Sequence, residues 1–284
     1  MKPLALAFAL LTATLLSGCG ASLTTITPVT PSAPASLAGN WQMQIQDIAA
    51  PANPTISYLL LGALSVKGPT VSGTFRILPA LLPSLASPCV QPLTIIPFTG
   101  TVDASSLLTL TSTPFSGSVV TMRLQLPLLN NIARGTTQIV GGACATPSLP
   151  LIGVYVPSVT GTYAGTLTPV QLGSFPIVST TPLPVTVTLV QAPANADGQF
   201  PVTASLTFNP MSCASISVPV TGFISGLSLK LTGPPTGTLA IPSATFYGAS
   251  ISYPGFPYLD SLLSISGSSA SCAGGLYNGN LVRQ

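Results

Sequence analysis

The segment Val185-Thr186-Val187-Thr188-Leu189-Val190 alternates apolar residues with threonine and is rich in β-branched side chains. Successive side chains of a β-strand point to opposite faces, so this alternation predicts a strand with one face in a core and the other in water. Residues 202–208 and 227–231 show the same pattern. Proline and glycine recur at intervals of roughly ten residues, which predicts turns between short strands. The sequence therefore predicts an all-β protein.

Four sequence landmarks occur twice and in the same order, which indicates duplication of a unit of about 120 residues. Residues 36–41 (SLAGNW) are echoed by 158–163 (SVTGTY). The other pairs are 95–102 with 218–224, 107–111 with 227–232, and 141–144 with 270–273. We predict two tandem β-domains, residues 37–156 and 157–284, each a meander barrel or a sandwich of about seven to eight strands.

The glycine and the aromatic residue that open each repeat distinguish these two architectures. The Gly-x-Trp at residues 39–41 resembles the opening strand of the calycins, a group of lipocalin-like barrel proteins, and the second repeat has Tyr163 in place of the tryptophan. The resemblance implies an eight-stranded barrel plugged by the aromatic at one end. We expect Trp41 and Tyr163 to fill the core rather than to contact a ligand.

Each repeat also ends in an apolar segment, at residues 151–156 and 276–282. If each of these pairs with the opening strand of its own repeat, the sheet closes and loses its exposed edges. A surface of low charge cannot protect such edges electrostatically, so this argument favours a barrel in each repeat over a sandwich.

The beginning of the chain has the three parts of an export signal: Lys2, an apolar run over residues 4–16, and small residues before Cys19. Leu16-Ser17-Gly18-Cys19 resembles the lipobox of bacterial lipoproteins. The resemblance implies that residues 1–18 are a signal peptide and that Cys19 is acylated. Gly20 is not the aspartate associated with retention in the inner membrane, which implies anchoring in the outer membrane. An ordinary secretory signal with a chance cysteine is the alternative.

Residues 19–36 follow the signal and are rich in Ser, Thr, Pro and Ala. They lack the apolar periodicity of a packed element, so we predict a flexible linker that holds the folded part away from the membrane. Several acyl chains on one cysteine would anchor the protein durably, since each buried methylene contributes about 0.8 kcal/mol.

The chain has five cysteines, and acylation of Cys19 leaves four. In an oxidising compartment these permit three disulfide pairings. Each predicted repeat holds two cysteines at matching places, which favours Cys89 with Cys144 and Cys213 with Cys272. The chain has no histidine and no Cys-x-x-Cys motif, so we predict neither a metal site nor a cofactor.

Charged residues make up only 4% of the chain, with seven Lys and Arg against four Asp and Glu, while hydrophobic residues make up 46%. This composition does not favour disorder or nucleic-acid binding. A transmembrane barrel would also have low charge, but aromatic residues are scarce here. Acid–base catalysis would have to rely on four aspartates. Two of them, Asp103 and Asp197, lie in sequences typical of turns, and we expect their side chains to form those turns. We therefore predict that the protein is not an enzyme.

Two apolar segments interrupted by proline, residues 78–85 and 170–177, distinguish the repeats, and the aromatic-rich loop 253–258 is a third candidate. They can cover a core or meet a partner or ligand. The candidate contact residues are Leu81, Leu82, Phe175, Phe256 and Tyr258.

Two functional hypotheses follow. The first is a lipid-anchored envelope lipoprotein that acts as a non-catalytic scaffold, adhesion or interaction module, with another envelope protein as partner. The second is a carrier of an apolar small molecule inside a calycin-like barrel. No polar group that would anchor a ligand stands out at the predicted inward positions, which favours the first.

Overall fold

The computed structural model describes residues 37–47, 55–79, 93–142, 145–170, 182–211, 214–233, 239–247, 258–267 and 275–284. Within them the fold is all-β, as predicted, and residues 31–284 belong to one compact unit. The signal segment, the linker and all five cysteines lie outside the described residues. Lipidation of Cys19 and the two disulfides therefore stay predictions.

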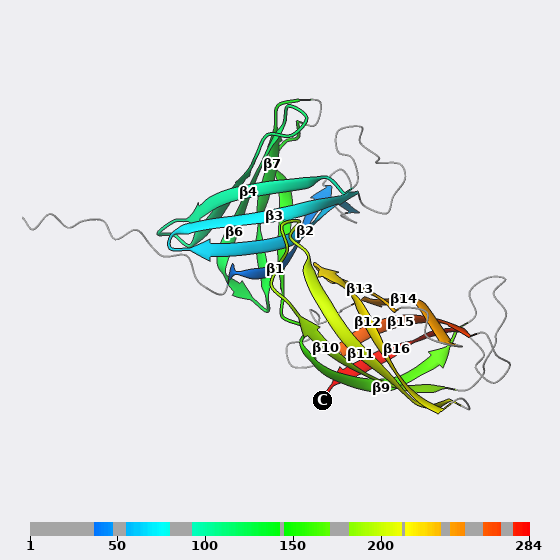
Figure 1. The fold of residues 1–284 in the computed structure, drawn as a ribbon. Helices are drawn as coiled ribbons and strands as arrows, with labels where there is room; N and C mark the ends of the chain where they lie inside the picture. The colour runs from blue at the N-terminus through cyan, green and yellow to red at the C-terminus, as the bar shows by residue number, and fades with distance from the viewer. Residues whose placement is uncertain are drawn as a thin grey trace, which may run out of the picture. The chain divides into compact units, whose positions relative to one another are not determined.

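The first eight strands form a closed antiparallel barrel in chain order, which we call the first barrel (Figure 1). They are β1 (Gly39–Asp47), β2 (Thr55–Lys67), β3 (Thr70–Pro79), β4 (Ile95–Val102), β5 (Leu107–Ser112), β6 (Val119–Leu129), β7 (Ile132–Val140) and β8 (Leu149–Val156). The barrel closes where β8 pairs with β1, from Asn40 opposite Val156 to Ile45 opposite Leu151. The predicted pairing of the last strand with the first is confirmed, and it decides for a barrel over a sandwich.

The next eight strands follow the same order and form the second barrel (Figure 1). They are β9 (Gly161–Pro169), β10 (Leu183–Gln191), β11 (Phe200–Met211), β12 (Ala214–Ser225), β13 (Ser228–Thr232), β14 (Leu239–Tyr247), β15 (Tyr258–Gly267) and β16 (Gly275–Arg283). Closure is again made by the last strand, which places Arg283 of β16 opposite Tyr163 of β9.

Alternating burial explains why these segments are strands. In β10, residues Val185, Val187 and Leu189 are buried, whereas Thr186 and Thr188 are exposed. The buried residues of the first barrel form one core around Trp41, Phe75 and Phe98, and those of the second form another around Tyr163, Phe208 and Tyr277. Each barrel is thus filled by its own side chains.

The connection between the barrels is short, since β8 ends at Val156 and β9 begins at Gly161. Val154 and Val156 of β8, and Val159 of the connection, are buried with the core of the second barrel. Side chains of β8 therefore contribute to the core cluster of the second barrel.

One predicted loop begins later than expected. Residues 78–85 were expected to form a loop, but β3 continues to Pro79, with Leu78 opposite Leu59 and Pro79 opposite Tyr58. The strand ends at Pro79, which has no N–H to donate to a neighbouring strand. Within the ranges given above, the chain forms no helix with the length and hydrophobicity that a membrane crossing requires.

Candidate functional site

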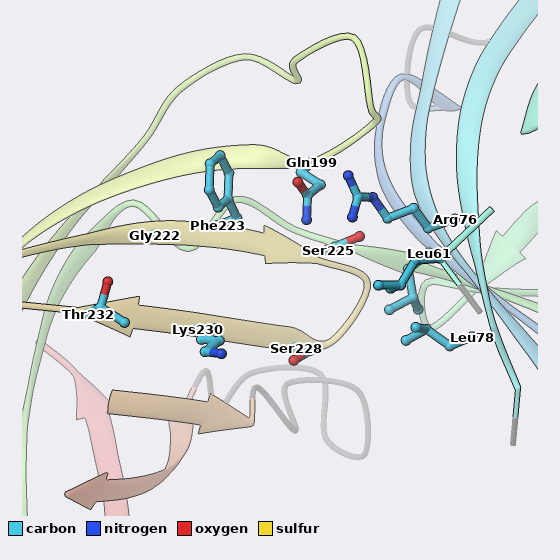
Figure 2. A pocket seen from close by; sticks show the side chains of 11 residues that line it. Leu61, Arg76, Leu78, Gln199, Gly222, Phe223, Ser225, Ser228, Lys230 and Thr232 are labelled. Atoms are coloured by element: carbon cyan, nitrogen blue, oxygen red, sulfur yellow. The ribbon is translucent and has the colours of Figure 1, made fainter. Parts of the chain in front are cut away.

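A groove outside the barrel interiors has a cavity volume of about 380 Å³, within the usual range for small-molecule sites (Figure 2). One side of the groove is lined by β2, β3 and the residue Leu93 just before β4. The other side is lined by β12, β13 and the end of the β10–β11 turn. The apolar side chains are Leu61, Leu78, Leu93 and Phe223, and the main polar ones are Arg76, Gln199, Ser225 and Lys230. We call it the Arg76 groove.

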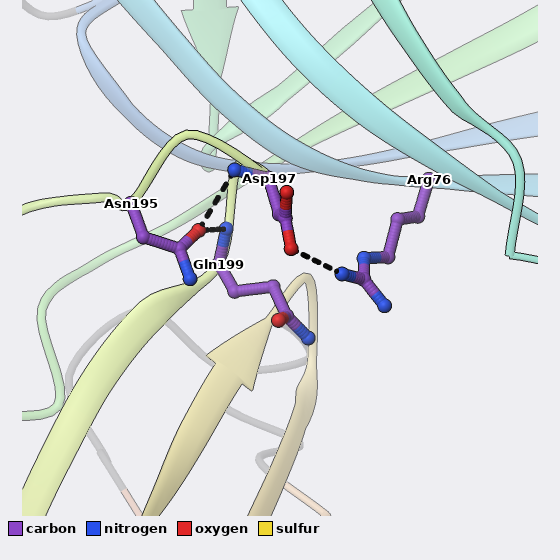
Figure 3. Close-up of polar contacts among 4 residues, drawn as sticks. All are labelled: Arg76, Asn195, Asp197 and Gln199. Atoms are coloured by element: carbon purple, nitrogen blue, oxygen red, sulfur yellow. Dashed lines mark hydrogen bonds and ion pairs between the residues drawn. The ribbon is translucent and has the colours of Figure 1, made fainter.

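Arg76 makes an ion pair with the β10–β11 turn. Its Nη2 lies 2.8 Å from Oδ2 of Asp197, which is 121 residues further along the chain (Figure 3). The two side chains are 20% and 45% exposed, so water weakens their attraction and the pair contributes at most about 1 kcal/mol. Its main effect is to place the guanidinium at the edge of the groove.

The turn that carries Asp197 is built by a different side chain from the one predicted. Oδ1 of Asn195 accepts hydrogen bonds from the backbone amides of Asp197 and Gln199, each 3.0 Å long (Figure 3). The prediction that the Asp197 side chain forms the turn is therefore wrong: Asn195 does so, and the Asp197 carboxylate is left to pair with Arg76.

Asp103 does form its turn as predicted. Its Oδ1 accepts hydrogen bonds from the hydroxyl of Ser105 and from the backbone amides of Ser105 and Leu107, at 2.6, 2.8 and 2.9 Å. These bonds stabilise the charged carboxylate, and the bond from the Ser105 hydroxyl is the largest cause of a lowered pKa for Asp103.

The β12–β13 turn contacts the first barrel beside the groove. Asn40 of β1 donates from Nδ2 to the carbonyl of Gly226 and accepts at Oδ1 from its amide, both over 2.8 Å. Oε1 of Gln42 accepts from the amide of Leu227 at 3.2 Å. Gly226 has a φ of +55°, and a Cβ there would lie 2.5 Å from Cδ2 of Leu61. Glycine suits this position because it adopts a positive φ without strain and has no Cβ to clash with Leu61.

Two buried polar atoms of the groove have no hydrogen-bond partner among the described residues: Nε of Arg76 and Oγ of Ser225. Ser225 is only 8% exposed. Buried polar groups in proteins nearly always have a partner, so a pair of unpartnered ones in the same hollow points to a missing ligand or water. Figure 2 shows Ser225 and Arg76 entering the groove from its opposite sides.

A second hollow, of about 690 Å³, is lined by residues of β2, β3 and β4 and by the β10–β11 turn. Its polar groups are hydroxyls and one amide, from Ser65, Ser72, Thr74, Thr99 and Asn195. It holds no charged side chain among its lining residues, so it offers less for recognising a ligand than the Arg76 groove.

The predicted contact residues of the apolar loops fall mostly outside the described part of the chain. Leu81, Leu82, Phe175 and Phe256 lie outside the described residues, and Tyr258 is the first residue of β15. Their role as contact residues stays a prediction.

The predicted core positions of the two opening aromatics are confirmed. Trp41 has no exposed surface, donates from Nε1 to the carbonyl of Leu37 at 2.8 Å, and meets the ring of Tyr155 edge-on at 5.7 Å between centroids. Tyr163 is 3% exposed and lies 6.0 Å beneath the guanidinium carbon of Arg283.

The groove could not be predicted from the sequence, because its residues come from separate segments. A signal was present in the difference between corresponding strands of the two barrels. Thr101 lies opposite Thr109 in the first barrel, and at the corresponding place in the second barrel Phe223 lies opposite Lys230. The positions at which the two barrels differ thus include two residues of the groove.

No family model matches the chain, and no curated protein matches it. What the described residues define is an all-β barrel protein with a small, partly charged groove outside its filled barrel interiors.

Proposed function

We propose that this protein is a non-catalytic interaction module of the bacterial cell envelope, anchored by acylated Cys19 and held off the membrane by the linker of residues 19–36. In this proposal it is a lipoprotein of the outer membrane, and its partner is another envelope component that binds its outer surface. No nucleic acid, metal or cofactor takes part.

The main support for the proposal is that packed side chains fill the interiors of both barrels. Trp41, Met43, Phe75 and Leu110 in the first barrel, and Leu189 in the second, are 0% exposed. A barrel whose inward side chains pack against one another has its contacts with other molecules on the outside. This favours an interaction module over a carrier with an internal ligand.

The outer surface supports the same proposal, because its polarity comes mainly from hydroxyls. Exposed hydroxyls bond across neighbouring strands, as Ser205 does with Ser217 at 2.8 Å and Thr162 with Thr188 at 3.2 Å. A surface of this kind offers many weak hydrogen-bonding groups and little charge, which suits contact with neutral partners.

We propose further that the chain consists of two duplicated domains, near residues 37–156 and 157–284. Matching positions in the two barrels support this. Gly39 and Gly161 both have φ between +139° and +152°, and each is covered by a closing-strand side chain, Tyr155 and Arg283 respectively. Those side chains lie opposite Trp41 and Tyr163 in the register.

Membrane fractionation tests the anchoring. Cys19→Ala should move the protein from the outer-membrane fraction to the soluble periplasmic fraction, because the acyl chains supply the hydrophobic anchor. Cys89→Ala removes another cysteine and is the matched control, which should stay with the membrane. Persistence of the Cys19→Ala protein in the outer-membrane fraction would contradict the proposal.

Native mass spectrometry of the released Cys19→Ala protein, before and after solvent extraction, distinguishes the two functional hypotheses. A mass without adducts supports the interaction module. A stoichiometric apolar adduct that survives in a variant of the Arg76 groove would place a ligand inside a barrel and favour the carrier.

A further inference from the structure

The two β-hairpin turns that follow β4 and β12 occupy the same place in the strand order but have different chemistry. In the first barrel the turn begins at Asp103, whose Oδ1 accepts three hydrogen bonds within the turn. In the second barrel the matching residue is Ser225, whose buried hydroxyl has no partner among the described residues. This hydroxyl lines the Arg76 groove instead of closing its own turn.

The strand positions next to these turns also differ in chemistry between the two barrels. The Thr101–Thr109 pair of the first barrel is replaced by Phe223 and Lys230, both of which line the groove. Phe223 is 44% exposed and gives the groove an apolar side chain. An apolar wall and a cation have thus been added where the first barrel has two hydroxyls.

The charges that line the groove are not balanced. Arg76 and Lys230 are cations, and the one carboxylate that reaches this place among the described residues is that of Asp197, which pairs with Nη2 of Arg76. Nε of Arg76 is left without a partner, and no ion pair involves Lys230 within the described ranges. One additional negative charge would neutralise the site.

We propose that the Arg76 groove binds an amphiphile with a single carboxylate, such as a medium-chain fatty acid. The carboxylate accepts hydrogen bonds from Nε of Arg76 and from the hydroxyl of Ser225, and Lys230 adds a second positive charge. The acyl chain lies along Phe223, Leu61 and Leu78. Charge-assisted bonds to a carboxylate are the strong class of hydrogen bond, and together they would give partners to both unpartnered atoms.

This inference is independent of the membrane anchor, because the groove is built from β2, β3, β12 and β13 and the turn before β11. The test uses the full chain with Cys19→Ala, so that no acyl chain of its own competes for the groove. If Cys19 is not acylated, this substitution is silent and the binding test is unaffected.

Isothermal titration calorimetry with decanoate measures the affinity, and decanol and acetate serve as probes of the chain and of the acid group alone. We expect decanoate to bind with one-to-one stoichiometry and both comparison probes to bind at least about tenfold more weakly, because a charged hydrogen bond contributes about 1.5–3 kcal/mol. Equal binding of decanol and decanoate would overturn the proposal.

Three substitutions in or beside the groove, and a fourth as a control, separate binding from a structural effect. Arg76→Gln should weaken decanoate binding by about tenfold or more, and Ser225→Ala by about fivefold. Asp197→Asn breaks the same ion pair as Arg76→Gln, yet it should strengthen binding, since it removes a competing carboxylate. Arg123→Gln, an exposed arginine of β6, should leave the affinity unchanged.

The Asp197→Asn result is decisive. If Arg76 acts only by holding the β10–β11 turn against β3, both substitutions should weaken binding to a similar degree. That outcome, or unchanged binding in both Arg76→Gln and Ser225→Ala, would overturn the proposed site.

Discussion

The two barrels share a strand order but use the turns after their second and fourth strands differently. In the first barrel, the β2–β3 turn is a short Gly68-Pro69 connection and the β4–β5 turn is closed by its own Asp103. In the second barrel, the matching turns carry Asp197 and Gly226, and both make hydrogen bonds to strands of the first barrel. The difference shows that two barrels with the same strand order and similar core patterns can differ in contact surface through their turns alone.

The cores differ less than the turns. Each opening strand places a glycine two residues before a large buried aromatic, Trp41 in the first barrel and Tyr163 in the second. The partner on the closing strand differs, being the ring of Tyr155 in one and the guanidinium of Arg283 in the other. An aromatic ring is attracted to either group, because its edge is positive and its face negative.

The largest expected effect is that of removing the first barrel's central aromatic. Trp41→Ala should lower the free energy of unfolding by about 3–5 kcal/mol, because it leaves a large cavity in a packed core. Urea denaturation followed by circular dichroism measures this loss. Thr101→Ala, at an exposed position of the same barrel, is the control and should change the free energy of unfolding little. If Trp41→Ala lowered the free energy of unfolding no more than Thr101→Ala does, the core role of Trp41 would be contradicted.

Two strand glycines test whether the barrels are equivalent. A Cβ at Gly100 or at Gly222 would lie 1.8 Å from a carbonyl oxygen of the next strand, Thr109 or Lys230. Gly100→Ala and Gly222→Ala should therefore each cost about 1–3 kcal/mol through overpacking. Similar losses of unfolding free energy, measured by urea denaturation, would support the equivalence of the two positions. A loss at one glycine alone would show that the matching positions are not equivalent.

The contact between the β12–β13 turn and the first barrel is the next test. Asn40→Ala should destabilise the protein by about 1–2 kcal/mol, since both polar groups of Gly226 lose their buried partner. Thr162 occupies the matching position in the second barrel, and its hydroxyl bond to Thr188 is exposed. Thr162→Ala should change stability by less than about 0.5 kcal/mol, so thermal denaturation of the two variants compares the positions directly.

The smallest expected effect is a difference at alkaline pH. Burial raises the pKa of Tyr163, against a smaller opposing effect of Arg283. The folded state then holds this proton more tightly than the unfolded state, so the stabilisation is complete below a pH of about 10 and is lost as pH rises through the raised pKa. Trp41, at the matching place, does not titrate. Tyr163→Phe should therefore flatten the alkaline part of the stability curve, as measured by urea midpoints, and an unchanged curve would contradict this account.

Because the chain has a single tryptophan, fluorescence reports on the first barrel alone. Circular dichroism reports on both. If alkaline unfolding is seen first by circular dichroism and later by fluorescence, the second barrel is the more sensitive to pH, as Tyr163 predicts.

Several features of the fold could be predicted from local patterns. The alternation over residues 185–190 identified β10, and the terminal apolar segments identified the strands that close each sheet. Both depend on nearest-neighbour chemistry: a strand alternates its faces, and a sheet edge without charge needs a partner. The burial of Trp41 and Tyr163 followed in the same way from their size and position.

The groove could not be predicted from local sequence patterns, because it depends on contacts between residues far apart in the chain. Arg76 and Asp197 are 121 residues apart, and Asn40 and Gly226 are 186 apart. Asp197 has the sequence context of a turn former, and only the fold reveals that Asn195 takes that role and leaves the carboxylate to Arg76. The sequence by itself determined which residues form strands and which of them face a core, because strand geometry links each residue to its neighbours in the chain. Tertiary structure alone decided which turns meet which strands and which polar groups lack a partner, because those contacts depend on the register and closure of complete sheets.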